Sequence, residues 1–169
     1  MGPIFCGRFT AQSSEPFVVF LIGMRVNRFW ALRKWTRVAA AMPPMIAELK
    51  RNPGLGLLHA QFFTYWRGVG VMQYWRSFEA LHAYAHSKTA AHLPAWAEFN
   101  RRVGSDGSVG IWHETYMVSP GGFESIYVNM PRFGLAAAMG SVPITGRLDS
   151  ARLRMTGQRD GAQDSPQNL

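Results

Sequence analysis

The chain has 169 residues, of which 47% are hydrophobic and 13% aromatic. This composition excludes a wholly disordered protein, and the length is typical of one domain with a sizeable core. Lysine and arginine outnumber aspartate and glutamate by 18 to 10, which gives a net charge of +8. Because the basic residues are dispersed over several predicted elements, the charge favours solvated faces over one anion-binding surface.

Cysteine usage and the lack of a long apolar run bear on where the protein works. Cys6 is alone, so no internal disulfide can form, which is typical of a reducing cytoplasm. The apolar run 17–22 is too short for a secretory signal or a bilayer span. The sequence therefore predicts a cytoplasmic protein without a membrane partner.

Hydrophobic periodicity divides the chain into an arm at 1–15, a folded domain at 16–144 and a polar, disordered tail at 145–169. Asn27 is expected to cap the first helix, which Pro43-Pro44 should interrupt, and Ser77 and Thr89 to cap later ones. The expected elements are, in order, a strand at 17–24, a helix containing Leu32 to Met42 and its continuation at 45–51, strands at 57–66 and 69–75 joined at Arg67-Gly68, helices at 78–86 and 90–103, a strand at 109–118 and a short strand at 125–129.

This β-α-β-β-α-β order predicts an α+β domain of the ferredoxin-like type. Helices cover one face of such a sheet, so its other face must be buried in another way. Here the strand at 57–66 is apolar on both faces, with Leu58, Ala60 and Phe62 on one and Phe63 and Tyr65 on the other. The pattern predicts a homodimer in which two sheets pack face to face.

The stretch Ile111 to Tyr116 places a histidine and a carboxylate in an otherwise apolar strand, where ionisable groups are costly unless paired or used. Strand alternation puts His113 on one face and Glu114 on the other. Two interpretations remain open. One of these groups makes a hydrogen bond at the dimer interface, or His113 is a general base in a cavity on the helix side, since an imidazole changes charge near neutral pH.

Several motifs in the same order resemble those of the dimeric α+β-barrel superfamily. More narrowly, residues 15–140 resemble the small monooxygenase-like family that includes a fungal enzyme of fumagillin biosynthesis. The motifs are Gly23-Met24-Arg25-Val26-Asn27, Tyr74-Trp75-Arg76-Ser77, His92 with Pro94 and Trp96, Trp112-His113-Glu114-Thr115-Tyr116, and Tyr127 with Asn129-Met130-Pro131.

The resemblance implies a dimeric α+β barrel and a monooxygenase-like oxidoreductase acting on a small hydrophobic or aromatic substrate. In a cofactor-free version, His113 removes a substrate proton and the substrate carbanion reacts with dioxygen. In a haem version, similar to aldoxime dehydratases, His92 holds the iron and His113 or Glu114 acts on its distal side, although His82 or His86 could also hold it. Arg25 and Asn27 are expected to contact substrate, and the cavity is expected to be shaped by Trp96, Trp112 and Tyr116.

Other functions remain as alternatives or are disfavoured. A non-catalytic haem or small-molecule binder is compatible with the same fold. No metal site is predicted, because His82 and His86 have i, i+4 spacing but no third ligand nearby. RNA-recognition modules share the element order, but Val69 to Tyr74 lacks their glycine-aromatic motif, so no nucleic-acid partner is expected.

Overall fold

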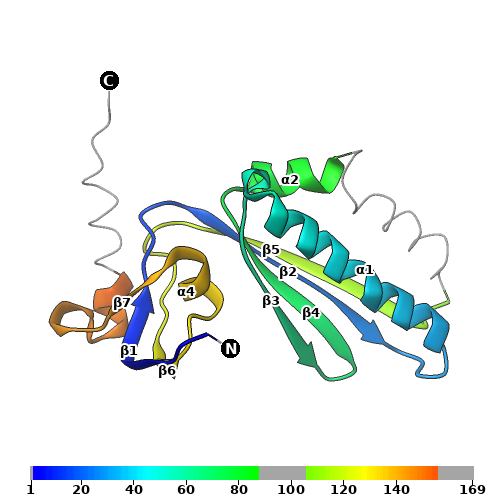
Figure 1. Cartoon of the computed structure of the whole chain (residues 1–169), viewed down its shortest axis with the longest axis horizontal. Helices are drawn as coiled ribbons and strands as arrows, with labels where there is room; N and C mark the ends of the chain where they lie inside the picture. Colours follow the sequence, from blue (N-terminus) through cyan, green and yellow to red (C-terminus); the bar gives the residue numbers. More distant parts are fainter. Residues whose placement is uncertain (1, 88–105, 156–169) are drawn as a thin grey trace. The chain divides into compact units, whose positions relative to one another are not determined.

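The computed structural model describes residues 2–87 and 106–155 (Figure 1). The chain divides into two compact units. One is Val19–Tyr116, and the other combines Met1–Val18 with Met117–Leu169. The sequence predicted a single domain at 16–144, whereas here the strands at both ends of that range continue into a second unit with its own sheet.

The larger unit is built on a four-stranded sheet in the order β3-β4-β2-β5. Its elements are β2 (Phe17–Val26), α1 (Leu32–Arg51), the 3-10 turn η1 (Pro53–Leu55), β3 (Leu57–Tyr65), β4 (Gly68–Trp75), α2 (Phe78–His86) and β5 (Val109–Val118). Each helix follows an inner strand and returns the chain to an edge strand, and both helices lie on one face of the sheet (Figure 1). This is the ferredoxin-like arrangement predicted from the sequence. The helix expected at 90–103, with its Thr89 cap, lies outside the described residues.

Helix α1 runs unbroken through Pro43 and Pro44, contrary to the predicted interruption. Each proline lacks an N–H donor and costs roughly 3 kcal/mol in a helix interior. Both are exposed, whereas the opposite side of α1 is an apolar stripe that packs against the sheet. Burial of that stripe outweighs the local penalty, because tertiary packing supplies most of a helix's stability.

The helix starts and turns differ partly from expectation. The Ser77 hydroxyl accepts a hydrogen bond from Ala80 N at 3.2 Å, which confirms the predicted cap of α2. Asn27 does not cap α1, which begins after Ala31 without a side-chain cap. The β3–β4 hairpin turns at Trp66 and Arg67, since Tyr65 pairs with Gly68. Arg67 has a positive φ of 59°, and its guanidinium donates to the carbonyls of Val26 and Asn27.

Side-chain alternation gives the sheet two different faces. Met24, Val26 and Val109 face the helices and form a core cluster with Trp35 and Val38 of α1. The opposite face is aromatic. There Trp112 donates its indole N–H to the Tyr65 hydroxyl at 2.6 Å, and that hydroxyl donates to Met24 O at 2.7 Å. A Cβ on Gly23 would lie 2.8 Å from Trp112 Nε1, so glycine is required for this close approach.

The second unit contains a three-stranded antiparallel sheet in the order β6-β1-β7. Its elements are β1 (Phe5–Ala11), β6 (Tyr127–Met130), α4 (Gly134–Met139), β7 (Ser141–Pro143) and the 3-10 turn η2 (Gly146–Leu148). The expected N-terminal arm at 1–15 is thus largely the central strand of a sheet. The pairing register of β1 with β6 shifts between Phe5 and Arg8, so polar and apolar residues do not alternate regularly along this strand. The sequence pattern therefore did not indicate a strand.

The expected disordered tail also begins too early. Arg154 is only 5% exposed, and its guanidinium donates to the Glu124 carboxylate and to Leu148 O. Residues 151–155 are helical. Hydrophobic periodicity does not detect this segment, because a buried arginine with hydrogen-bond partners holds it in place instead of an apolar side chain. Among the described residues, no helix combines the length and apolar content needed to cross a bilayer.

We expect His59 on β3 to make the stability of the fold pH-dependent. Its Nε2 atom is buried without a hydrogen-bond partner in the described part of the chain. Burial lowers the pKa of His59, a nearby Lys50 lowers it further, and a hydrogen bond with Gln61 opposes them. The folded protein therefore binds this proton less readily than the unfolded chain does, so acid favours unfolding.

We expect the contribution of His59 to the free energy of unfolding to be constant above pH 6.5, which is about the usual histidine pKa. As the pH decreases below that value, the free energy of unfolding should decrease. The decrease should reach up to about 1.4 kcal/mol per pH unit until the folded-state pKa is passed. Urea unfolding of the wild type and of His59→Gln between pH 8 and 4.5 measures this. His86→Gln, at an exposed histidine, is the control. Equal slopes for wild type and His59→Gln would contradict the assignment.

Candidate active site

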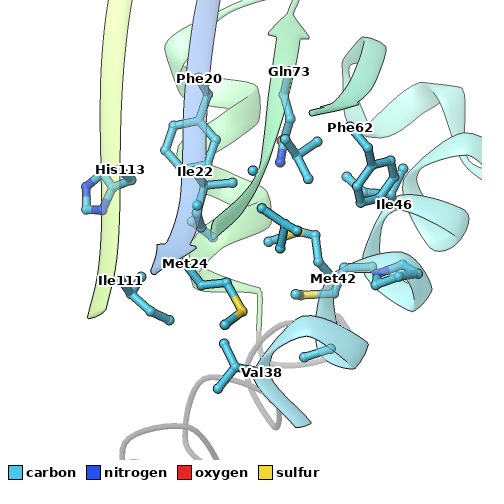
Figure 2. A pocket seen from close by; sticks show the side chains of 18 of the residues that line it. Phe20, Ile22, Met24, Val38, Met42, Ile46, Phe62, Gln73, Ile111 and His113 are labelled. Atoms are coloured by element: carbon cyan, nitrogen blue, oxygen red, sulfur yellow. The ribbon is translucent and has the colours of Figure 1, made fainter. Parts of the chain in front are cut away.

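A cavity of about 910 Å³ lies in the unit Val19–Tyr116 and is lined by the sheet and by helices α1 and α2 (Figure 2). Such a volume is within the range of small-molecule sites. The sheet contributes Phe20, Ile22 and Met24 from β2, Phe62 from β3, Val69, Val71, Gln73 and Trp75 from β4, and Ile111, His113 and Thr115 from β5. The strand period of two accounts for this set, since alternate residues of each strand face the helices.

The helices supply an apolar wall with a basic end. Val38, Met42 and Ile46 recur on one side of α1 and line the cavity (Figure 2). Arg33 and Arg37, nearer the start of α1, are also among the lining residues. The neighbouring Lys34 also lines the cavity and forms a 2.6 Å ion pair with Asp106. This ammonium, with the hydroxyl and amide of Ser108, holds the pKa of the Asp106 carboxyl well below its usual range. The arginines give one part of the lining a positive charge that favours anionic ligands.

His113 reaches the cavity from β5, as the helix-side interpretation predicted. Its ring lies 5.7 Å from the ring of Phe20, between centroids, on the sheet side of the cavity (Figure 2). The side chain is exposed, so a ligand can reach it. His82 lines the same cavity from α2 and stacks on His86 with ring centroids 4.0 Å apart.

Glu114, Trp112 and Tyr116 lie on the opposite face of β5 and are absent from the described cavity lining. The Tyr116 hydroxyl donates to Glu114 Oε2 at 2.6 Å, and this hydrogen bond raises the pKa of Tyr116. The structure therefore separates His113 from the three residues predicted to act with it. Strand alternation is the physical reason, since neighbouring residues of β5 face opposite sides of the sheet.

Arg25 and Asn27 join strand ends rather than line the cavity. Arg25 Nη1 donates to Asn27 Oδ1 at 2.5 Å, and Asn27 Nδ2 donates to Gly107 O at 3.0 Å. These contacts tie the end of β2 to the turn before β5, and the predicted contacts of Arg25 and Asn27 with substrate stay predictions. His92 and Trp96 lie outside the described residues, and their predicted roles stay predictions.

Two polar groups of the lining were missed in the sequence. Gln73 of β4 is only 4% exposed. The sequence did contain an indication, because Gln73 lies on the same strand face as Val71 and Trp75, where an amide is unexpected. The hydroxyl of Tyr84 on α2 donates to Glu48 Oε2 at 3.0 Å. Burial and the adjacent carboxylate raise the pKa of Tyr84, so it remains a neutral hydrogen-bonding group. In the described ranges, no three histidine, cysteine or acidic side chains are placed to hold a metal ion.

Comparison with known proteins gives a family and a fold. The sequence profile of the family described as "Monooxygenase af470-like" matches residues 17–135. Monooxygenase af470 of Aspergillus fumigatus is 30% identical over 148 residues, covering 82% of this chain and 46% of that protein. The chain thus spans about half the length of this curated relative. A crystal structure of aldoxime dehydratase matches with a TM-score of 0.63 at 16% identity, over 80% of this chain and 40% of that chain, which shows the fold alone.

If the cavity holds apolar ligands, filling it from the sheet should exclude them. We expect Ile22→Trp to weaken binding of the fluorescent probe N-phenyl-1-naphthylamine by at least about tenfold, because the indole would occupy the volume the probe needs. Leu21→Trp, one residue away on the other face of β2, is the matched control and should bind the probe as wild type does. Fluorescence titration measures both. Equal affinities in the two variants would contradict the assignment of the cavity.

Proposed function

Because the chain belongs to the monooxygenase af470-like family, we propose that it is a monooxygenase that oxidises a small hydrophobic or aromatic molecule held between the sheet and helices α1 and α2. The observation that carries the proposal is the imidazole of His113, which reaches from β5 into a large cavity whose lining is mostly apolar. An apolar cavity with a few convergent polar groups is the usual form of an enzyme site for such substrates.

Proton abstraction is the step for which the chain's own residues are suited. In this proposal His113 accepts a proton from a phenol or an activated C–H group, which leaves an electron-rich aromatic anion. The electron pair of that anion forms a C–O bond to dioxygen and gives a peroxide, which takes up the abstracted proton. Loss of water then breaks the O–O bond and the remaining C–H bond at the oxidised carbon, so that one oxygen atom becomes a new carbonyl and the other leaves in water with the two hydrogens that the substrate has lost. The substrate itself supplies all four electrons that reduce dioxygen.

The cavity walls favour this chemistry in two ways. Phe20 lies beside His113, and an aromatic ring packs against a flat substrate in an offset or edge-on arrangement. The apolar residues of α1 and β2 exclude water, so reactive intermediates are protected from side reactions. Arg33 and Arg37 favour a substrate that becomes anionic when it loses its proton.

The proposal includes a homodimer formed through the other face of the sheet. That face presents the aromatic side chains of Phe63, Tyr65, Trp112 and Tyr116. An aromatic sheet face that no helix covers favours association between two copies.

His113→Ala is expected to lower oxygen consumption by roughly 10²- to 10⁴-fold, the usual contribution of a general base. Its affinity for N-phenyl-1-naphthylamine should stay within about twofold of wild type, because truncation removes no apolar wall. An oxygen electrode with phenols and anthrone-like compounds measures turnover. His86→Ala, at a histidine absent from the described lining, is the control. Undiminished turnover in His113→Ala would refute the assignment, and binding without turnover in wild type would identify a non-catalytic binder.

A second candidate is haem-dependent chemistry in the same cavity. His82 from α2 and His113 from β5 both line it, which fits an iron ligand on a helix and a second imidazole facing it. Haem, when bound, would supply a redox-active iron. Arg33 and Arg37 would be suited to its propionate groups.

This candidate predicts that added hemin gives one Soret band per chain in the visible spectrum. His82→Ala should remove the band if His82 is the ligand, whereas His86→Ala should leave it. A band that survives in His82→Ala would exclude His82 as the iron ligand and would favour His92, the ligand predicted from the sequence. The lack of any band in wild type would exclude the haem candidate.

A further inference from the structure

Gln73 is the polar group of the cavity that the proposed proton transfer does not use. It belongs to β4, an inner strand, and only 4% of it is exposed. Its neighbours on the same face of the strand are Val71 and Trp75, and its cross-strand partner on β3 is Ala60. Figure 2 shows the side chain of Gln73 extending into the cavity with its amide nitrogen at the tip. An amide has thus been placed where every adjacent group is apolar or aromatic.

Trp75 fixes which end of this amide faces the cavity. The fully buried indole donates its N–H to Gln73 Oε1 at 2.9 Å. An indole nitrogen is only a donor, so a flipped amide would set two donors against each other. The carboxamide oxygen is therefore held by Trp75, and the NH₂ group is the end left for the cavity.

The two donor hydrogens of this NH₂ group make no hydrogen bond to another described residue. The Nε2 atom is not one of the buried, unpaired side-chain atoms of the described residues, so it is open to the cavity and not sealed in the core. A donor held in one orientation at the wall of a mostly apolar cavity is suited to an oxygen atom of a ligand.

We infer that the Gln73 NH₂ group binds a carbonyl oxygen of the substrate, and that the substrate is an aromatic or ring-fused ketone. This inference rests on the proposed function and specifies the substrate class. Gln73 and His113 lie on strands separated by β2, so two strand spacings place their backbones at least about 10 Å apart. A molecule of two or three fused rings can extend between them across Phe20.

This arrangement links the two polar groups chemically. When His113 takes a proton from a position conjugated with the carbonyl, the C–H or O–H bond breaks and its electron pair delocalises onto the carbonyl oxygen. The negative charge then develops at Gln73, where a preorganised N–H donor stabilises it. Gln73 is thereby a substrate-binding group whose orientation is set by Trp75.

The test compares two ligands that differ in one oxygen, 1-tetralone and tetralin. Their dissociation constants follow from displacement of N-phenyl-1-naphthylamine. The wild type should prefer the ketone by about fivefold, the effect of one neutral hydrogen bond. Neither ligand needs to be oxidised, so the measurement does not depend on turnover.

Two variants remove the donor in different ways. Gln73→Leu removes the whole amide, whereas Gln73→Met keeps the length of the side chain and a weak sulfur acceptor for the Trp75 N–H but has no donor. In both, the ketone preference should fall to about one or below. Gln73→Met reports the result if Gln73→Leu fails to fold. Gln61→Leu, on the neighbouring strand and facing the other side of the sheet, is the matched control and should keep the preference.

The outcomes separate this inference from the proposed function. A ketone preference that persists in both Gln73 variants, or that is missing in wild type, would overturn the role of Gln73. A preference that depends on Gln73 without oxygen consumption by any ketone tested would uphold the binding role and refute the monooxygenase. If neither ligand displaces the probe from wild type, the cavity does not take ring-sized molecules, and both proposals are refuted.

Discussion

The alternation of side chains along the four strands is the constraint on which the rest of the larger unit depends. Because successive residues face opposite sides, one face of the sheet forms the floor of the cavity and the other an aromatic layer. Neighbouring residues of β5 show the result, since His113 belongs to the cavity and Glu114 is hydrogen-bonded to Tyr116 on the reverse side. A shift of β5 by one residue would exchange the two sets completely, so the register of this strand determines which ionisable group can meet a ligand.

The polar groups of the sheet are positioned by pairing with aromatic donors. Tyr65 receives the Trp112 indole N–H on one face, and Gln73 receives the Trp75 indole N–H on the other. In both pairs a tryptophan donor determines how the partner points. The two pairs differ in their remaining donors, because the Tyr65 hydroxyl donates a hydrogen bond to Met24 O, whereas the Gln73 NH₂ group has no acceptor among the described residues. The first pair is therefore structurally complete, and the second is completed by a ligand.

The sequence predicted the larger unit well, because its strands and helices follow clear periods. It placed α2 and its Ser77 cap correctly and put His113 and Glu114 on opposite faces. It failed where long-range contacts override local pattern. The helix α1 passes through two prolines, and the buried Arg154 anchors a segment whose composition looks disordered. Gln73 was overlooked because a lone glutamine in a strand has no motif, although its position between apolar residues of one face was visible.

The two polar groups of the cavity also differ in how rigidly they are held, and this suits the roles proposed for them. Gln73 is on an inner strand, almost fully buried and fixed by Trp75, as is required of a donor that must place one oxygen atom accurately. His113 is on the edge strand β5 and is exposed, so it can return a proton to solvent after each turnover. A base buried as deeply as Gln73 would have to retain the proton, with its charge, in an apolar cavity, and desolvation would oppose the transfer. The strand order β3-β4-β2-β5 therefore separates precise binding from proton exchange within one sheet.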